Sequence, residues 1–188
     1  MRLLSSAPRR WRQLSSNVRR QNLPSQLSKQ MNTISPKELP RAFEALYKDK
    51  SAAALAFESK DSFEMAYLAR WSVVETTVKL ITHAEACQLL RLQLDEWSRF
   101  LDKPNRKSPN PIRHFPTDAA KSKLPTATEL KKQFATALNL LELLDPAKKY
   151  RKKRNAIAHS AEAFAQASTY EEYKAKVQTA TDELRKAL

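Results

Sequence analysis

The sequence predicts an all-α protein, and three observations favour this fold class. The 188 residues contain no glycine, whereas the tight turns of β-rich folds usually need residues at positive φ. Apolar side chains recur at spacings of three and four residues along several segments, which is the period of an α-helix. Proline and polar clusters separate these segments. Four to five amphipathic helices with short connections predict an up-and-down bundle.

The first helix is predicted after Ser35, because Ser35-Pro36-Lys37-Glu38 has the spacing of a capping box with proline at the first helical position. A short helical turn is expected at 52–57. Asp61 or Ser62 then caps a long helix, with a kink expected near His83. Its apolar stripe keeps the helical spacing through Phe63, Tyr67, Trp71, Val74, Val78, Ile81, Cys87, Leu90, Leu94, Trp97 and Leu101.

Residues 103–118 contain four prolines in a polar, basic stretch and are predicted to form a long loop. Thr126 or Thr128 opens the next helix, which carries an apolar stripe at Leu130, Phe134, Leu138, Leu141 and Leu144. Asp145-Pro146 predicts the start of a further helix. Ser168-Thr169-Tyr170-Glu171 has capping-box spacing and predicts a C-terminal helix that runs to Leu188. One helical domain is thus expected at 35–188.

Residues 1–34 are predicted to be a mobile basic tail, because they are rich in Arg, Ser and Gln and contain no acid. Three interpretations stay open at this point. The composition is typical of an organelle transit peptide, it suits a basic arm that adds affinity for nucleic acid, and Met31 could be the true start of translation. A cytoplasmic location is expected, with organelle targeting as the alternative.

Composition narrows the function classes. Without glycine, neither a dinucleotide-binding fingerprint nor a Walker loop is possible. The net charge of +14 indicates a polyanionic partner, with nucleic acid ahead of an anionic membrane. The single cysteine, Cys87, excludes an intramolecular disulfide. No apolar run reaches the roughly 18 residues that a membrane-spanning helix needs, so no integral membrane protein is expected.

The stretch KKYRKKRNAIAHS, at 148–160, carries the most specific chemical signal. Six of the seven residues from Lys148 to Arg154 are basic. Asn155 and His159 are four residues apart and share one helical face, and Arg154 lies about 140° around the helix from His159. Histidine can act as acid or base near neutral pH, and arginine binds phosphate bidentately. This set of side chains suits transesterification within RNA without a metal.

Arg154-Asn155-x-x-x-His159 resembles the R-polar-x-x-x-H motif of the HEPN superfamily (higher eukaryotes and prokaryotes nucleotide-binding domains). The predicted bundle is similar as well, since a tryptophan-bearing long helix comes early and the motif lies on a late helix. The resemblance covers roughly residues 36–188. In one toxin subgroup a tyrosine stands two residues after the histidine, and here that position is Ala161.

The resemblance implies a metal-independent endoribonuclease in a toxin–antitoxin, antiphage defence or RNA-processing role. It implies a composite site across a homodimer, RNA as substrate, a cognate inhibitor or antitoxin as partner, and no cofactor. Arg154 would stabilise the phosphate, Asn155 would orient groups, and His159 would transfer the proton. Backbone binding is expected from Lys148, Lys149, Tyr150, Arg151, Lys152 and Lys153, with Tyr150 stacking on a base or packing within the bundle. The alternative is a non-catalytic module that binds RNA or protein.

Three further candidates are weaker. Glu75 is expected to pair with Lys79 one helical turn later; by analogy with HEPN proteins, it would instead orient Arg154. His83 and Cys87 are four residues apart, but a zinc site needs three or four protein ligands and no second pair is evident. His114 lies in the proline-rich loop, where RNA contact and a passive role are both open. We therefore predict no metal site.

Overall fold

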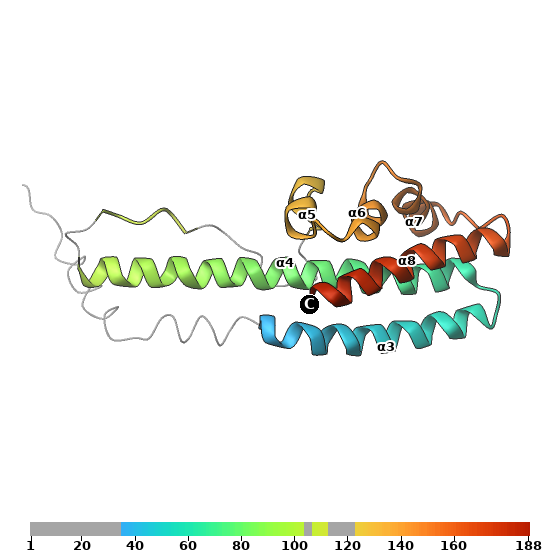
Figure 1. Cartoon of the computed structure of the whole chain (residues 1–188), viewed down its shortest axis with the longest axis horizontal. Helices are drawn as coiled ribbons and strands as arrows, with labels where there is room; N and C mark the ends of the chain where they lie inside the picture. The colour runs from blue at the N-terminus through green and yellow to red at the C-terminus, as the bar shows by residue number, and fades with distance from the viewer. Residues whose placement is uncertain (1–34, 104–106, 113–122) are drawn as a thin grey trace, which may run out of the picture. The chain divides into compact units, whose positions relative to one another are not determined.

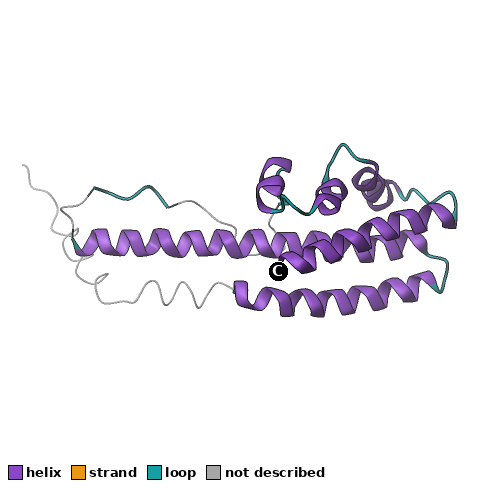
Figure 2. Ribbon diagram, in the orientation of Figure 1, coloured by secondary structure: helices purple, strands orange, loops and turns teal. Residues whose placement is uncertain are grey.

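A computed structural model of the chain describes residues 35–103, 107–112 and 123–188. Within these ranges the regular structure is helical and no strand occurs (Figure 2). This confirms the all-α fold class. The elements are η1 (Pro36–Glu38), α3 (Leu39–Glu58), α4 (Phe63–Asp102), α5 (Ala127–Gln133), α6 (Leu138–Leu144), α7 (Lys149–Ser160) and α8 (Ala167–Ala187). The predictions for the 1–34 tail, Met31 and His114 lie outside the described residues, as does much of the proline-rich loop.

Contacts group the described residues into two units, 35–90 with 123–188, and 91–103 with 107–112. In the larger unit, α3, the first part of α4 and α8 are three long helices that lie side by side. The shorter α5, α6 and α7 follow one another along one side of α4 and α8 (Figure 1). The described part of the larger unit is thus a helical bundle with more and shorter helices than the predicted four or five.

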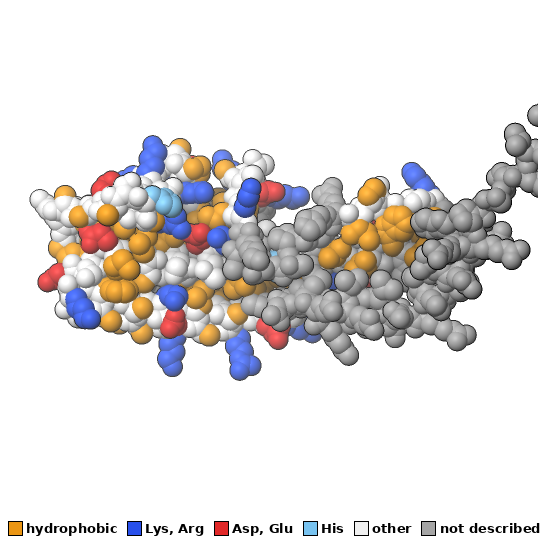
Figure 3. Space-filling model, turned by 180° about the vertical axis from the view of Figure 1, so that it is seen from behind, with side chains coloured by type: hydrophobic (Ala, Val, Ile, Leu, Met, Phe, Trp, Pro, Cys, Tyr) orange, Lys and Arg blue, Asp and Glu red, His pale blue; other side chains and the backbone are white. Residues whose placement is uncertain are grey.

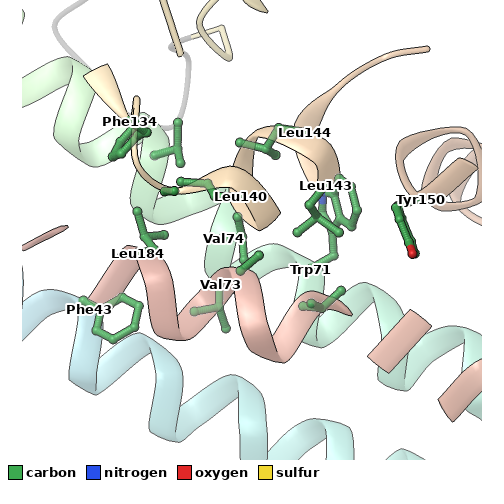
Figure 4. Close-up of a cluster of buried hydrophobic side chains, with 14 of the residues drawn as sticks. Phe43, Trp71, Val73, Val74, Phe134, Leu140, Leu143, Leu144, Tyr150 and Leu184 are labelled. Atoms are coloured by element: carbon green, nitrogen blue, oxygen red, sulfur yellow. The ribbon is translucent and has the colours of Figure 1, made fainter. Parts of the chain in front are cut away.

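The apolar stripe of α4 forms the centre of the core in the larger unit, as the spacing predicts. Tyr67, Val74 and Val78 are fully buried, and Trp71 is nearly so. Leucines of α6 pack on this stripe, together with residues of α3 and α8 (Figure 4). Figure 4 shows Leu140, Leu143, Leu144, Val74 and Leu184 gathered between α4, α6 and α8, with Phe43 of α3 beside Leu184. Tyr150 and Ile157 of α7 belong to the same core, so the core fixes the position of α7 relative to α4.

The N-terminal signal at Ser35 is present, but it opens a 3₁₀ turn before the α-helix. The Glu38 carboxylate accepts a hydrogen bond of 2.8 Å from the Ser35 backbone N–H, and α3 begins at the next residue. The short helical turn expected at 52–57 is wrong as a separate element, because α3 continues through it to Glu58. Its alanines extend the buried face, where Ala54 has no exposed surface.

The start of α4 agrees with the sequence signal. The Ser62 carbonyl accepts the first helical hydrogen bond, at 3.0 Å from the Ala66 N–H, after a turn in which Asp61 takes φ 55°. The helix then continues without a break from Phe63 to Asp102. His83 is buried within it, and the helix continues through this position.

The single helix predicted from Thr126 to Leu144 is wrong, because the chain forms two short helices there. Thr126 caps α5 in a capping box, with its backbone N–H 2.8 Å from the Glu129 carboxylate. The helix ends at Phe134, which has φ −122° and ψ 43°. The turn lets Phe134 and Ala137 both enter the core while Leu138 faces solvent, 69 % exposed. The apolar spacing alone predicts one continuous helix, but packing of Phe134 and Ala137 in the core favours two short helices.

A carboxylate from another helix starts α6. Ala137, its N-cap residue, provides no side-chain cap. Glu183 of α8 accepts hydrogen bonds from the Leu140 backbone N–H at 2.9 Å and from Asn139 Nδ2 at 2.6 Å. Backbone N–H groups in the first turn need such acceptors, so α8 supplies the cap that the local sequence lacks.

Two predicted helix starts are displaced. Asp145 does not cap α7, because its carboxylate accepts from the Ala147 N–H at 2.8 Å and α7 begins four residues later, at Lys149. The capping box at Ser168 is also wrong, since α8 begins at Ala167 with Gln166 as the N-cap residue. Asp145 thus forms a local turn in place of the predicted cap, whereas the Ser168 hydroxyl donates a hydrogen bond of 3.3 Å to the Gln166 side chain.

The smaller unit contains the second part of α4 and residues 107–112. The Trp97 indole donates a hydrogen bond of 2.9 Å to the Asn110 carbonyl, and its ring meets Phe100 edge-on at 5.8 Å between centroids. Leu92, Leu101 and Ile112 remain exposed.

Candidate functional site

The α7 helix, which carries the predicted motif, is anchored through its inner face. Tyr150 and Ile157 are its buried residues. The Tyr67 hydroxyl of α4 donates a hydrogen bond of 3.0 Å to the Tyr150 carbonyl, and the Tyr150 ring packs edge-on against Tyr173 at 5.2 Å. These contacts fix the rotation of α7 about its axis, and so determine which side chains face α4.

Arg154 reaches from α7 to Glu75 of α4. Its Nη2 lies 2.7 Å from Glu75 Oε2, and Lys79 Nζ lies 3.1 Å from the other carboxylate oxygen. Burial alone would raise the pKa of Glu75, but the Lys79 hydrogen bond and the Arg154 charge outweigh it, so the pKa lies below the usual carboxyl value. Glu75 therefore contacts both partners that the sequence left open.

Asn155 and His159 occupy the outer side of α7. Arg154 Nη1 donates a hydrogen bond of 3.1 Å to Asn155 Oδ1, so the carboxamide helps to orient the guanidinium. His159 is exposed in the last turn of the helix. Its ring is accessible to a ligand, but it does not line the pocket that Arg154 and Asn155 share. The motif thus has an inner part at Arg154 and an outer part at His159.

A pocket of about 360 Å³ lies between α4, the segment at 123–124 and α7. Four cationic side chains and one carboxylate contribute to its wall, with Asn155 and two apolar residues: Trp71, Glu75, Lys79, Lys123, Leu124, Arg151, Arg154 and Asn155. Sequence reasoning missed Trp71 and Lys123 as site residues. Trp71 follows the core stripe, and nothing in the local sequence around Lys123 indicates that the segment returns to α7.

The basic run is less available to a polyanion than its sequence suggests. Lys149 pairs with Glu172, and Lys153 donates to Glu162 and to the Ala163 carbonyl, both at 2.6 Å. Arg151 Nη1 donates to the Leu144 carbonyl at 2.7 Å. On the face seen in Figure 3, basic side chains stand among acidic and hydrophobic ones and do not form a continuous basic surface. Lys148 and Lys152 are exposed.

Tyr150 has a packing role in this structure. Only 8 % of its surface is exposed, and its ring lies between Tyr173 and the Lys149 and Lys176 ammonium groups. A base could not stack on it without displacing these groups. Of the two roles that the sequence left open, stacking on a base and packing within the bundle, its position in the structure corresponds to packing.

His83 and Cys87 lie together in the buried part of α4, with the sulfur 3.8 Å from each ring nitrogen. Among residues 35–103, 107–112 and 123–188, no group of three or more His, Cys, Asp or Glu side chains is arranged to hold a metal ion. In the same ranges, no helix combines the length and the apolar character needed to cross a membrane.

Comparison of the chain with models of protein families, with curated proteins and with solved structures finds no match.

Proposed function

We propose that this protein is a metal-independent, HEPN-type endoribonuclease that acts on RNA in the cytoplasm, in a toxin–antitoxin, defence or RNA-processing role. The observation that supports the proposal most is the ion pair of 2.7 Å between Arg154 and Glu75. It fixes a phosphate-binding side chain one and a half helical turns from an exposed histidine. The R-N-x-x-x-H spacing supports the assignment to the HEPN superfamily.

In this proposal Arg154 stabilises the charge that develops on the phosphoryl oxygens. Glu75 and Asn155 orient its guanidinium. His159 removes the 2′-hydroxyl proton or protonates the 5′-oxygen leaving group. One histidine supplies one proton-transfer group at a time, so a second copy of the chain would contribute the other His159 across a two-fold axis. The exposure of His159 is compatible with such an interface.

A non-catalytic RNA-binding module is the second candidate function. Lys149 and Lys153 pair with acids, whereas the pocket beside α7 brings four cationic side chains together with one carboxylate. Binding there needs Arg154 but not His159. The two candidates therefore differ in what they predict for a single substitution at His159.

Cleavage of single-stranded RNA in excess EDTA tests the proposal. We expect 2′,3′-cyclic phosphate ends, and a loss of roughly 10²–10⁴-fold in rate for His159→Ala. Arg154→Lys should also lose activity, because lysine lacks the bidentate fork. Ser160→Ala, a change at an exposed neighbour on α7, is the matched control and should keep full activity. Undiminished cleavage by a folded His159→Ala protein would disprove the catalytic assignment, and RNA binding without cleavage would favour the module.

A further inference from the structure

The pocket beside α7 has a strong excess of positive charge over its single acid. Lys79, Lys123, Arg151 and Arg154 line it together with Glu75. Glu75 contacts Lys79 and Arg154 at once, so its one negative charge offsets only one of these two cations. No carboxylate among the described residues lies within ion-pair distance of Lys123 or Arg151. The wall therefore carries a formal excess of three positive charges.

A buried hydrogen-bond donor in the same wall has no hydrogen bond of normal geometry with the described residues. Trp71 is 2 % exposed, and its indole N–H makes no hydrogen bond of normal geometry with the described residues, although it helps to keep the nearby Glu75 carboxyl ionised. An indole nitrogen can only donate, and a buried polar group without a partner is costly. An acceptor-rich ligand in the pocket would give this donor a hydrogen bond of normal geometry.

These groups converge from three separate parts of the chain. Lys79 and Trp71 come from α4, Lys123 from the segment before α5, and Arg151 and Arg154 from α7. A single anionic group in the pocket would meet donors from several directions, as a tetrahedral phosphate requires. A volume of about 360 Å³ is at the small end for ligand sites. The pocket thus suits one compact, highly charged group.

We propose that this pocket binds a dianionic phosphomonoester, such as the terminal phosphate of an RNA. An internal phosphodiester carries one negative charge, whereas a terminal phosphate carries between about 1.5 and 2 at pH 7. Three excess positive charges favour the second group. The choice of RNA as carrier of the phosphate rests on the proposed function. The pocket's affinity for a phosphomonoester does not.

The test compares RNA oligonucleotides of one sequence that end in a 5′-phosphate, a 3′-phosphate or hydroxyls only. Binding is measured in EDTA with the full-length His159→Ala chain, so that cleavage cannot remove the probe. We expect one phosphate-ended RNA to bind about tenfold tighter than the hydroxyl-ended one, because hydrogen bonds to charged groups are strong. Inorganic phosphate should abolish this difference by competition. Equal affinity for all three RNAs would overturn the proposal.

Two substitutions locate the effect. Lys123→Gln and Arg151→Gln should each reduce the preference for a phosphate end. Lys186→Gln removes the same charge from an exposed position in α8 outside the pocket wall, and should keep the preference. Arg151 also bonds to the Leu144 carbonyl, whereas Lys123 is exposed, so the Lys123 variant is the safer one if folding is disturbed. A preference that survives both pocket substitutions would place the phosphate elsewhere and refute the assignment.

Tryptophan emission gives an independent signal. The chain has three tryptophans, and replacing Trp11 and Trp97 by Phe leaves only Trp71, in the pocket wall. Adding inorganic phosphate should change its emission with the same dependence on Lys123. A phosphate signal without RNA cleavage would leave the pocket assignment intact while the proposed nuclease fails. Cleavage without an end preference or a phosphate signal would refute the pocket assignment and leave the proposed nuclease intact.

Discussion

Glu58, at the end of α3, is the carboxylate with the most side-chain partners in the described structure. Arg70 donates to it through two nitrogens, at 2.9 and 3.2 Å, Lys174 lies 3.3 Å away, and the Tyr170 hydroxyl also donates to it. Burial would raise the pKa of Glu58, but the hydrogen bonds from Tyr170 and Arg70 and the charges of Arg70 and Lys174 outweigh it, so the pKa is lowered. This carboxylate joins α3, α4 and α8.

We expect Glu58→Gln to lower the free energy of unfolding by about 2–3 kcal/mol at pH 7, because a partly buried arginine loses its counterion. The lowered pKa sets the pH dependence. The ionised carboxylate stabilises the fold above its unfolded pKa, and this contribution disappears as the pH falls through the folded pKa. The difference between wild type and variant, measured by urea unfolding, should therefore shrink as the pH falls from about 5 to about 3.

Glu171→Gln is the matched control for this prediction. Glu171 is 61 % exposed at its side chain and pairs with Lys174 on its own helix, so its replacement should change little. A constant effect of Glu58→Gln across this pH range would show that the carboxylate stabilises by packing and not by charge.

At the scale of elements, α7 ends in a way that its sequence does not favour. Ala161 takes the left-handed conformation, with φ 50° and ψ 33°, and the N–H of Glu162 bonds to the Ala156 carbonyl at 3.3 Å. Glycine is the usual residue at such a helix end, and the chain has none. A side chain of α7 itself stabilises the strained turn, because Lys153 donates hydrogen bonds to Glu162 and to the Ala163 carbonyl.

Ala161→Gly should therefore stabilise the protein, by roughly 1 kcal/mol, since the steric penalty of a left-handed alanine exceeds the entropy that glycine loses on folding. Thermal unfolding monitored by circular dichroism measures it. Ala163→Gly, two residues further along and without a positive φ, is the control and should be neutral or destabilising. If Ala161→Gly lowered the melting temperature, the helix would not end in the left-handed turn described.

The elements also show which features of the fold and the site can be predicted from the sequence. The apolar stripe of α4 and the capping signals at Ser35 and Thr126 depend on neighbours within a few residues, and there the predictions agree with the structure. The break between Phe134 and Leu138 depends on core packing, and the cap of α6 comes from Glu183, more than forty residues away. Glu75 and Arg154 were both candidates, but only the fold places them 2.7 Å apart. Only the tertiary fold brings Lys123 close to α7.

At the scale of the whole molecule, the net charge of +14 has to be considered together with how the charges pair. In the described residues of the larger unit, many lysines and arginines form ion pairs, such as Lys149 with Glu172 and Arg185 with Glu44. The sequence carries much of the positive excess in residues 1–34, with seven basic residues and no acid, and in residues 103–123, with six basic residues and one acid. In the described structure, four cations and one acid meet at the pocket beside α7. The net charge of the whole chain would thus attract RNA at long range. Selection among RNA groups would depend only on the few cations at the pocket.

The proposed nuclease needs two chains for one site, and this gives a test at the level of the assembly. A mixed dimer of one wild-type and one His159→Ala chain has a single proton-transfer histidine at the two-fold axis, and should be nearly inactive. Wild-type protein refolded with an excess of His159→Ala chain should therefore lose several-fold of its activity per wild-type chain. RNA cleavage in EDTA at constant wild-type concentration measures the loss.

The control for this mixing experiment is an excess of the double variant His159→Ala/Ile157→Asp. Ile157 is 7 % exposed on the inner face of α7, so a buried aspartate there should displace the helix and prevent docking on a wild-type chain. Its excess should leave the activity unchanged, and this also accounts for competition by inert protein for RNA. If the His159→Ala chain likewise caused no loss, each chain would carry a complete site. The second proton-transfer group would then have to come from the same copy as Arg154.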